Sequence, residues 1–170
     1  MNRPPYKTLI LCTGNSARSI IGEYLLRTKG KGRFETFSAG AKPTGQVNPL
    51  ALWVLKEHYG VDASDARSKS WDEFANVKFD FVITVCDNAK ESCPVFLGHP
   101  TMAHFGSPDP ADCHGTDEEK KRLFVQVASQ ISRRLDLLCS LPDHQLEPLR
   151  IRQIGGHFPI ENDAAGPATP

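Results

Sequence analysis

Eight residues near the start of the chain, the segment CTGNSARS, combine a nucleophile with groups that bind anions. Helix N-termini and nearby arginines lower the pKa of a cysteine from about 8.5 to roughly 3.5–7.5, so Cys12 is expected to be a thiolate nucleophile. Gly14 and Asn15 suit the left-handed backbone angles of a loop whose N–H groups face an anion. The Arg18 guanidinium can hold two oxygens of a tetrahedral oxyanion. The segment therefore predicts nucleophilic attack on a bound oxyanion.

A strand and a helix are expected on either side of this loop. Residues 7–11 are a short apolar run typical of a strand, and residues 20–29 have the pattern of a helix that Gly30 ends. A polar loop between them presents N–H groups to an anion, which the helix dipole favours. The residues expected to bind the oxyanion are Thr13, Gly14, Asn15, Ser16, Ala17, Arg18 and Ser19. An isolated cysteine is usually a buried structural residue, but its polar neighbours here favour a reactive one.

The chain up to residue 140 alternates between expected strands and helices. Strands are expected at 7–11, 33–38, 80–85 and 101–105, and helices at 20–29 and 49–59. A short helix is expected to open at 70–73, and a long helix is expected to begin after Thr116 and to end before Pro142. Asn48 and Thr116 are residues that cap the start of a helix. This alternation predicts an α/β fold with a parallel sheet covered on both faces. Ligands of such sheets bind at the carboxyl ends of strands, and Cys12 and Cys86 each follow an expected strand.

Composition limits the kind of protein this can be. A chain of 170 residues suggests one domain with a sizeable core. Twenty basic and twenty acidic residues give a net charge of zero, which indicates neither a nucleic-acid nor a membrane partner. No signal peptide or membrane-spanning stretch is visible. The five cysteines are an odd number, so we expect a reducing, cytoplasmic compartment and thiols or transient disulfides rather than structural ones.

Two parts of different composition divide the chain. Residues 1–140 are expected to form the folded domain. Residues 141–170 are expected to be a C-terminal extension that is partly disordered, because Pro, Gly and Ala are frequent there and the end lacks periodicity. Only residues 151–160 have a composition that would allow docking on the domain.

The loop also carries a family resemblance. The pattern Cys-x5-Arg-Ser, with Gly14 and Asn15 inside it, resembles the anion loop of the low-molecular-weight protein tyrosine phosphatases. Together with Cys86 and Cys93, the form CTGNSARS is closer to the thioredoxin-linked arsenate reductases built on that fold. The resemblance covers residues 6–140. It implies a three-layer α/β fold around a four-stranded parallel sheet, in which the first and third strands are neighbours.

The resemblance also implies a sequence of reactions among three cysteines. In it, Cys12 attacks arsenate, Cys86 attacks Cys12 and expels arsenite, and Cys93 then attacks Cys86. An external thiol reductant, thioredoxin or alternatively glutaredoxin or glutathione, reduces the last disulfide. Phosphate and sulfate would compete with arsenate as oxyanions. No bound cofactor is expected, and the absence of a compact Cys-x2-Cys pair argues against a metal site.

The segment between two of these cysteines has a geometric consequence. If residues 86–93 form a helix, Cys86 and Cys93 lie about 10 Å apart along its axis. A disulfide requires Cα atoms roughly 4.4–6.8 Å apart. Such a helix would therefore have to unwind before the bond could form.

Asp109, followed by proline, is the expected general acid, because the resemblance places in that position the acid that protonates the leaving oxygen. A simple turn is the alternative, since Asp-Pro is common in turns. Phosphatases of this fold usually carry tyrosines just after this Asp-Pro, whereas Ala111, Asp112 and Cys113 follow here, which favours a reductase. Two alternatives stay open: a low-molecular-weight tyrosine phosphatase, and a non-catalytic module that binds oxyanions.

Lys69 departs from the pattern of those relatives that bind potassium, which have an aspartate at the matching position. We expect its ammonium group to lie beside Asn15, Glu23 and Ser38 and to replace the cation. A potassium site is therefore not predicted.

Overall fold

A computed structural model describes residues 3–157 of the chain. Its sheet has four parallel strands in the order β2-β1-β3-β4. The strands are β1 (Tyr6–Cys12), β2 (Phe34–Gly40), β3 (Phe81–Thr84) and β4 (Thr101–His104). The first and third strands are neighbours, as predicted, and Leu11 of β1 pairs with Thr84 of β3. The carboxyl ends of these two central strands therefore meet at one edge of the sheet.

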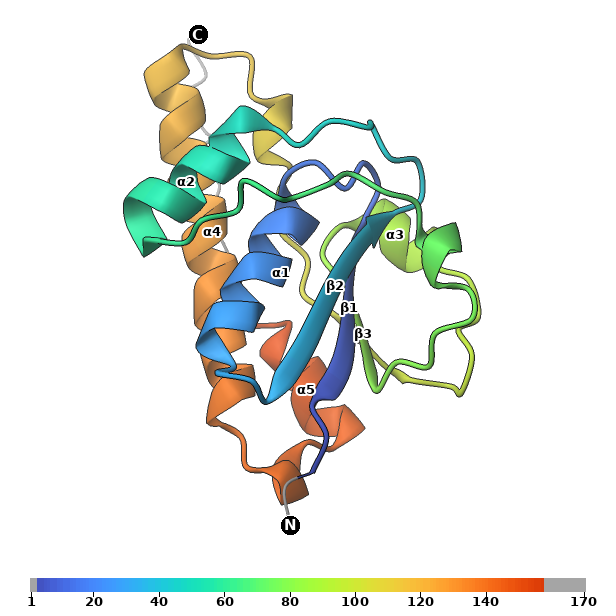
Figure 1. Cartoon of the computed structure of the whole chain (residues 1–170). Helices are drawn as coiled ribbons and strands as arrows, with labels where there is room; N and C mark the ends of the chain where they lie inside the picture. Colours follow the sequence, from blue (N-terminus) through green and yellow to red (C-terminus); the bar gives the residue numbers. More distant parts are fainter. Residues whose placement is uncertain (1–2, 158–170) are drawn as a thin grey trace, which may run out of the picture.

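Helices cover both faces of the sheet. They are α1 (Arg18–Lys29), α2 (Pro49–Tyr59), α3 (Asp87–Ser92), α4 (Asp117–Ser140) and α5 (Pro148–Ile154), with short 3₁₀ helices at Trp71–Phe74, Pro110–Asp112 and Asp143–Gln145. Figure 1 shows α1, α2 and α4 together on one side of the sheet and α3 on the other. The predicted three-layer α/β fold is confirmed.

Local signals in the sequence fix where several helices begin and end. The Asn48 side chain accepts a hydrogen bond from the Leu50 N–H at 2.9 Å and so caps α2. Gly60 ends that helix with φ 63°, an angle that glycine adopts at little cost. Thr116 and Glu119 form a reciprocal capping box at the start of α4.

The core lies between the sheet and the helices. All four residues of β3 are buried, as expected for a strand covered on both faces. The largest fully buried side chains are Phe124, Leu9, Ile10, Leu11, Ile20, Ile21, Leu25, Leu26, Leu55, Ile83, Leu135 and Leu138. Each contributes about 1.5–3 kcal/mol on burial. This packing fixes the strand ends that position the site. Within residues 3–157, no helix is both long and apolar enough to cross a membrane.

Part of the expected C-terminal extension is ordered, since residues 143–145 form a 3₁₀ turn and residues 148–154 form α5. Ile151 and Ile154 are buried, at 0% and 5% exposure, where α5 packs against β4 and α4. Burial of these two side chains stabilises a helix too short to persist alone. The rest of the expected disorder, at 158–170, lies outside the described residues.

Candidate active site

The CTGNSARS loop connects β1 to α1 and surrounds the Cys12 sulfur. The Asn15 N–H donates a hydrogen bond to Cys12 Sγ at 3.2 Å, and Ser19 Oγ lies 2.8 Å from the same sulfur. Asn15 has φ 45°, the left-handed angle that was predicted. Its side-chain amide donates to Ser19 Oγ at 2.7 Å and Ser38 Oγ at 3.0 Å, and these bonds hold the residue in that conformation.

The carbonyl groups of the loop point away from the sulfur. Those of Thr13, Gly14 and Ser16 accept hydrogen bonds from the N–H groups of residues 42, 44 and 48. Carbonyl and N–H point in opposite directions across a trans peptide, so the N–H groups of Gly14, Asn15 and Ala17 face the other way. The Asn15 bond to Cys12 follows this direction. Backbone donors are therefore collected on the side of the thiol, as an anion site requires.

Two glycines contribute to the loop through close packing. The expectation of a left-handed angle at Gly14 is wrong, since among described residues the positive φ angles do not include it. A Cβ at Gly14 would instead lie 3.1 Å from the Thr44 side chain. A Cβ at Gly40, the last residue of β2, would lie only 2.5 Å from the Thr13 carbonyl oxygen. Sequence reasoning missed Gly40, because only the fold brings it against the loop.

Cys12 is buried, with 3% of its surface exposed. Burial raises the pKa of its thiol, because a thiolate loses its hydration there. The hydrogen bonds from Ser19 and the charge of Arg18 lower the same pKa without cancelling the effect of burial. The pKa of Cys12 is thus raised, whereas the composition of the loop predicted a lowered pKa. The loop sequence carries no information about burial.

Arg18 and Asp109, far apart in the sequence, meet beside the loop. Arg18 Nη2 lies 3.2 Å from Asp109 Oδ2, and Arg18 Nη1 donates to the Ser107 carbonyl at 3.0 Å. Asp109 Oδ1 accepts from the Ala111 N–H at 3.0 Å, which fixes the carboxyl at the start of a 3₁₀ turn. The expected general acid and the expected oxyanion-binding guanidinium thus share one small region. The contribution of Ser107 had no signal in the sequence.

Cys86 lies next to the loop, and Cys93 lies at the far end of the following helix. Cys86 Sγ is 3.3 Å from Thr13 Oγ1, so the second expected cysteine contacts the residue that follows the first. Cys86 is the N-cap of α3 and Cys93 is its C-cap. Cys93 is half-buried, and burial raises the pKa of its thiol to about 11. All five cysteines are free thiols.

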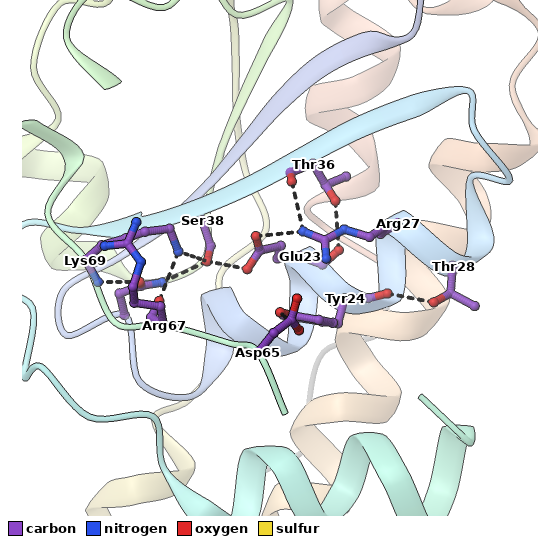
Figure 2. Close-up of polar contacts among 10 residues, drawn as sticks. Glu23, Tyr24, Arg27, Thr28, Thr36, Ser38, Asp65, Arg67 and Lys69 are labelled. Atoms are coloured by element: carbon purple, nitrogen blue, oxygen red, sulfur yellow. Dashed lines mark hydrogen bonds and ion pairs between the residues drawn. The ribbon is translucent and has the colours of Figure 1, made fainter. Parts of the chain in front are cut away.

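Lys69 is buried at the back of the loop, within the cluster drawn in Figure 2. Its backbone N–H donates to Asn15 Oδ1 at 3.0 Å, and its ammonium group donates to Ser38 Oγ at 3.4 Å. Ser38 Oγ donates in turn to Glu23 Oε2 at 2.8 Å. Burial raises the pKa of Glu23, and the charge of Lys69 opposes this rise. Of the three residues expected beside the ammonium group, it contacts Ser38 directly and Glu23 through Ser38, whereas Asn15 is bound by the backbone N–H of Lys69.

The remaining cysteines and histidines form no metal centre. Within residues 3–157, no group of three or more His, Cys, Asp or Glu side chains is arranged to hold a metal ion. His104 instead bridges strands and helix: its ring nitrogens lie 2.8 Å from Thr84 Oγ1 and 3.0 Å from Asp87 Oδ1. Cys139 packs against the core.

Known proteins resemble this chain in sequence and fold. Residues 7–147 match the family described as low molecular weight phosphotyrosine protein phosphatase. An arsenate reductase of Halalkalibacterium halodurans is 38% identical over 125 residues, which are 74% of this chain and 88% of that protein.

Two solved structures show the same similarity. A structure described as an arsenate reductase in the phosphate binding state has a TM-score of 0.67 at 25% identity, over 79% of this chain and 97% of its own. A thioredoxin-dependent arsenate reductase of Corynebacterium glutamicum has a TM-score of 0.59 at 27% identity, over 81% of this chain and 62% of its own.

Proposed function

Because the chain belongs to the low molecular weight phosphotyrosine protein phosphatase family, we propose that it reduces arsenate to arsenite through Cys12, Cys86 and Cys93. The observation that carries this proposal is the contact between Cys86 Sγ and Thr13 Oγ1 at 3.3 Å. Hydrolysis of a phosphate ester requires no second thiol beside the loop, whereas transfer of two electrons to arsenic does. The relatives named arsenate reductases support the choice of oxyanion.

The first step uses the loop and Asp109. Backbone N–H groups and the Arg18 guanidinium hold three oxygens of arsenate while the Cys12 thiolate forms a bond to arsenic. One arsenate oxygen leaves as water, and Asp109 donates a proton to it. Arg18 is held for this task by Ser107 and Asp109.

The second step reduces arsenic. The Cys86 thiolate forms a bond to the sulfur of Cys12, and the sulfur–arsenic bond breaks with its electron pair remaining on arsenic. Arsenic leaves as arsenite, and a Cys12–Cys86 disulfide remains. Leu11 of β1 lies opposite Thr84 of β3, so Cys86 lies one residue beyond the position opposite Cys12, on a neighbouring strand about 4.8 Å away. Cys86 is close enough to Cys12 to raise the pKa of its thiol.

The third step moves the disulfide away from the loop. The Cys93 thiolate attacks the Cys86 sulfur, and Cys12 leaves as a thiolate ready for another cycle. As long as α3 is intact, its length keeps Cys86 and Cys93 about 10 Å apart along the axis. Unwinding of α3 therefore has to precede this step, and exposure to water would bring the raised pKa of Cys93 back toward its ordinary value.

An external dithiol closes the cycle by exchange with the Cys86–Cys93 disulfide and supplies the two electrons. We propose a thioredoxin in this role, in the reducing cytoplasm, because one solved neighbour is described as thioredoxin-dependent. Glutaredoxin and glutathione are the alternative donors, and phosphate and sulfate would compete for the loop.

An assay with two substrates separates the alternatives. The unchanged chain should turn over arsenate with thioredoxin. Cys12→Ser should lose this activity and any hydrolysis of para-nitrophenyl phosphate, whereas Cys86→Ser should lose only the arsenate activity. Cys113→Ser is the matched control and should keep both. A phosphatase would hydrolyse para-nitrophenyl phosphate but would not turn over arsenate with thioredoxin even as the unchanged chain, and a binding module would bind phosphate without turnover of either substrate.

A further inference from the structure

A buried arginine outside the reacting groups joins two distant parts of the chain. Arg134 of α4 is 4% exposed. Its Nε donates to the His157 carbonyl at 2.8 Å, and its Nη1 donates to the Gly106 carbonyl at 2.6 Å. Burial lowers the pKa of Arg134, so its place in the interior depends on these hydrogen bonds.

The Gly106 side of this contact leads directly to the candidate site. The carbonyl of Ser107, the next residue, accepts a hydrogen bond from the Arg18 guanidinium. The Ser107 hydroxyl donates a hydrogen bond to Gln130 Oε1 at 2.6 Å. Asp109 follows two residues later and pairs with Arg18. A shift of Gly106 would therefore be passed on to both charged groups of the site.

The His157 side leads to helix α5. Gly155, the C-cap of α5, lies against the end of β4, because a methyl group added there would overlap the backbone carbonyl of His104. Arg152 Nε donates to the Met102 carbonyl on β4 at 3.1 Å. A surface hollow beside the site is lined by Asp87, His104, Gly106, Ser107, Pro108 and Gly155. The family match ends at residue 147, so α5 lies outside it.

We propose that Arg134 is a positioning residue through which the C-terminal helix α5 holds the loop 105–109, and with it Arg18 and Asp109, in place for the oxyanion. The guanidinium bonds the two segments at once, so the site of this chain includes an element beyond the matched family segment. This inference rests on the proposed function only in assigning the oxyanion to Arg18 and Asp109.

Two adjacent glycines provide a matched test in the full chain. Gly155→Ala forces the end of α5 away from His104, whereas a Cβ at Gly156 meets only the Gln153 carbonyl at 3.6 Å, an ordinary contact. Gly155→Ala should raise the dissociation constant for inorganic phosphate, measured by calorimetry, by roughly tenfold, as expected for one hydrogen bond to a charged group. Gly156→Ala should leave it unchanged.

The double variant shows whether the effect passes through Arg134. Arg134→Met alone should weaken phosphate binding about as much as Gly155→Ala, and adding Gly155→Ala to it should weaken binding no further. The inference would be overturned if the double variant weakened phosphate binding by the product of the two single effects. It would also be overturned if Gly155→Ala bound phosphate as tightly as the unchanged chain. Arg134→Met removes a buried contact and can lower stability. If this variant does not fold, the Gly155→Ala result alone decides.

Failure of the proposed function would look different. If the unchanged chain binds no phosphate, that proposal fails, and amide hydrogen exchange across residues 105–109 then decides the positioning role by itself. Faster exchange in Gly155→Ala than in Gly156→Ala supports it, and equal exchange in the two variants refutes it.

Discussion

Cys12 experiences opposing influences on its pKa. Its burial disfavours the thiolate, while the Ser19 hydroxyl, the Asn15 N–H and the Arg18 charge favour it. Burial is the larger influence in the structure, so the pKa of the thiol is raised. The first step of the proposed reaction requires the thiolate. Its rate should therefore depend on how much thiolate the pH allows.

The first prediction is that the reactivity of Cys12 increases with pH beyond neutrality. A thiol whose pKa is raised by burial gains thiolate about tenfold per pH unit until that pKa is reached. Alkylation of Cys12 by iodoacetamide, followed by mass spectrometry, should therefore accelerate steadily from pH 6 to 9. Ser19→Ala should slow it further at each pH. A rate that is already constant between pH 6 and 8 would mean that the loop donors outweigh burial.

Lys69 places its ammonium group beneath the loop, in contact with Ser38 and, through Ser38, with Glu23. We predict that potassium and sodium at equal ionic strength give the same activity and the same free energy of unfolding. Lys69→Ala should lower that free energy by about 2 kcal/mol, since it removes a charge that favours the buried Glu23 carboxylate, which keeps its ion pair with Arg27 at 3.0 Å. Lys56→Ala, an exposed lysine of α2, is the matched control. A clear gain from potassium in the unchanged chain would contradict this role.

At the scale of elements, α3 is the part of the fold that the proposed reaction must change. It is six residues long, and of these only Ala89 is buried, so few apolar contacts stabilise it. Pro94 follows the C-cap residue Cys93 and disfavours a helical conformation there. Its ends carry the two cysteines that must meet. The fold thus gives this role to a helix that costs little to unwind.

We predict that oxidation unwinds α3. In the Cys12→Ser variant, oxidation should form the Cys86–Cys93 bond, and amide hydrogen exchange across residues 86–94 should become faster than in the reduced protein. Exchange in α4 is the internal control and should stay unchanged. Equal protection of 86–94 in both states would contradict the prediction, as would a disulfide map without that bond.

At the scale of the whole molecule, the central sheet and most helices could be predicted from the sequence. The largely apolar segment 81–85 indicates a strand buried on both faces, and Asn48 and Thr116 mark helix starts through hydrogen bonds that are local in the chain. The left-handed Asn15 was predictable for the same reason, because its conformation depends on residue type. Local chemistry thus predicted the elements and the position of the loop.

The features that could not be predicted depend on contacts between distant segments. Helix α5 is short and becomes stable only through Ile151 and Ile154, which are buried against β4 and α4. The sign of the pKa change at Cys12 depends on burial, which the loop sequence does not contain. The contact from Arg134 to Gly106 joins residues 28 positions apart. Such contacts become visible only once the fold has brought the segments together.

The most direct measurement of the proposed reaction uses Cys93→Ser, which lacks the last thiol of the sequence. After reduction and removal of the reductant, the variant is mixed with arsenate, and arsenite and disulfides are quantified. We predict one arsenite per chain, a Cys12–Cys86 disulfide located by mass spectrometry, and then no further turnover. Release of no arsenite, or of arsenite without that disulfide, would contradict the account.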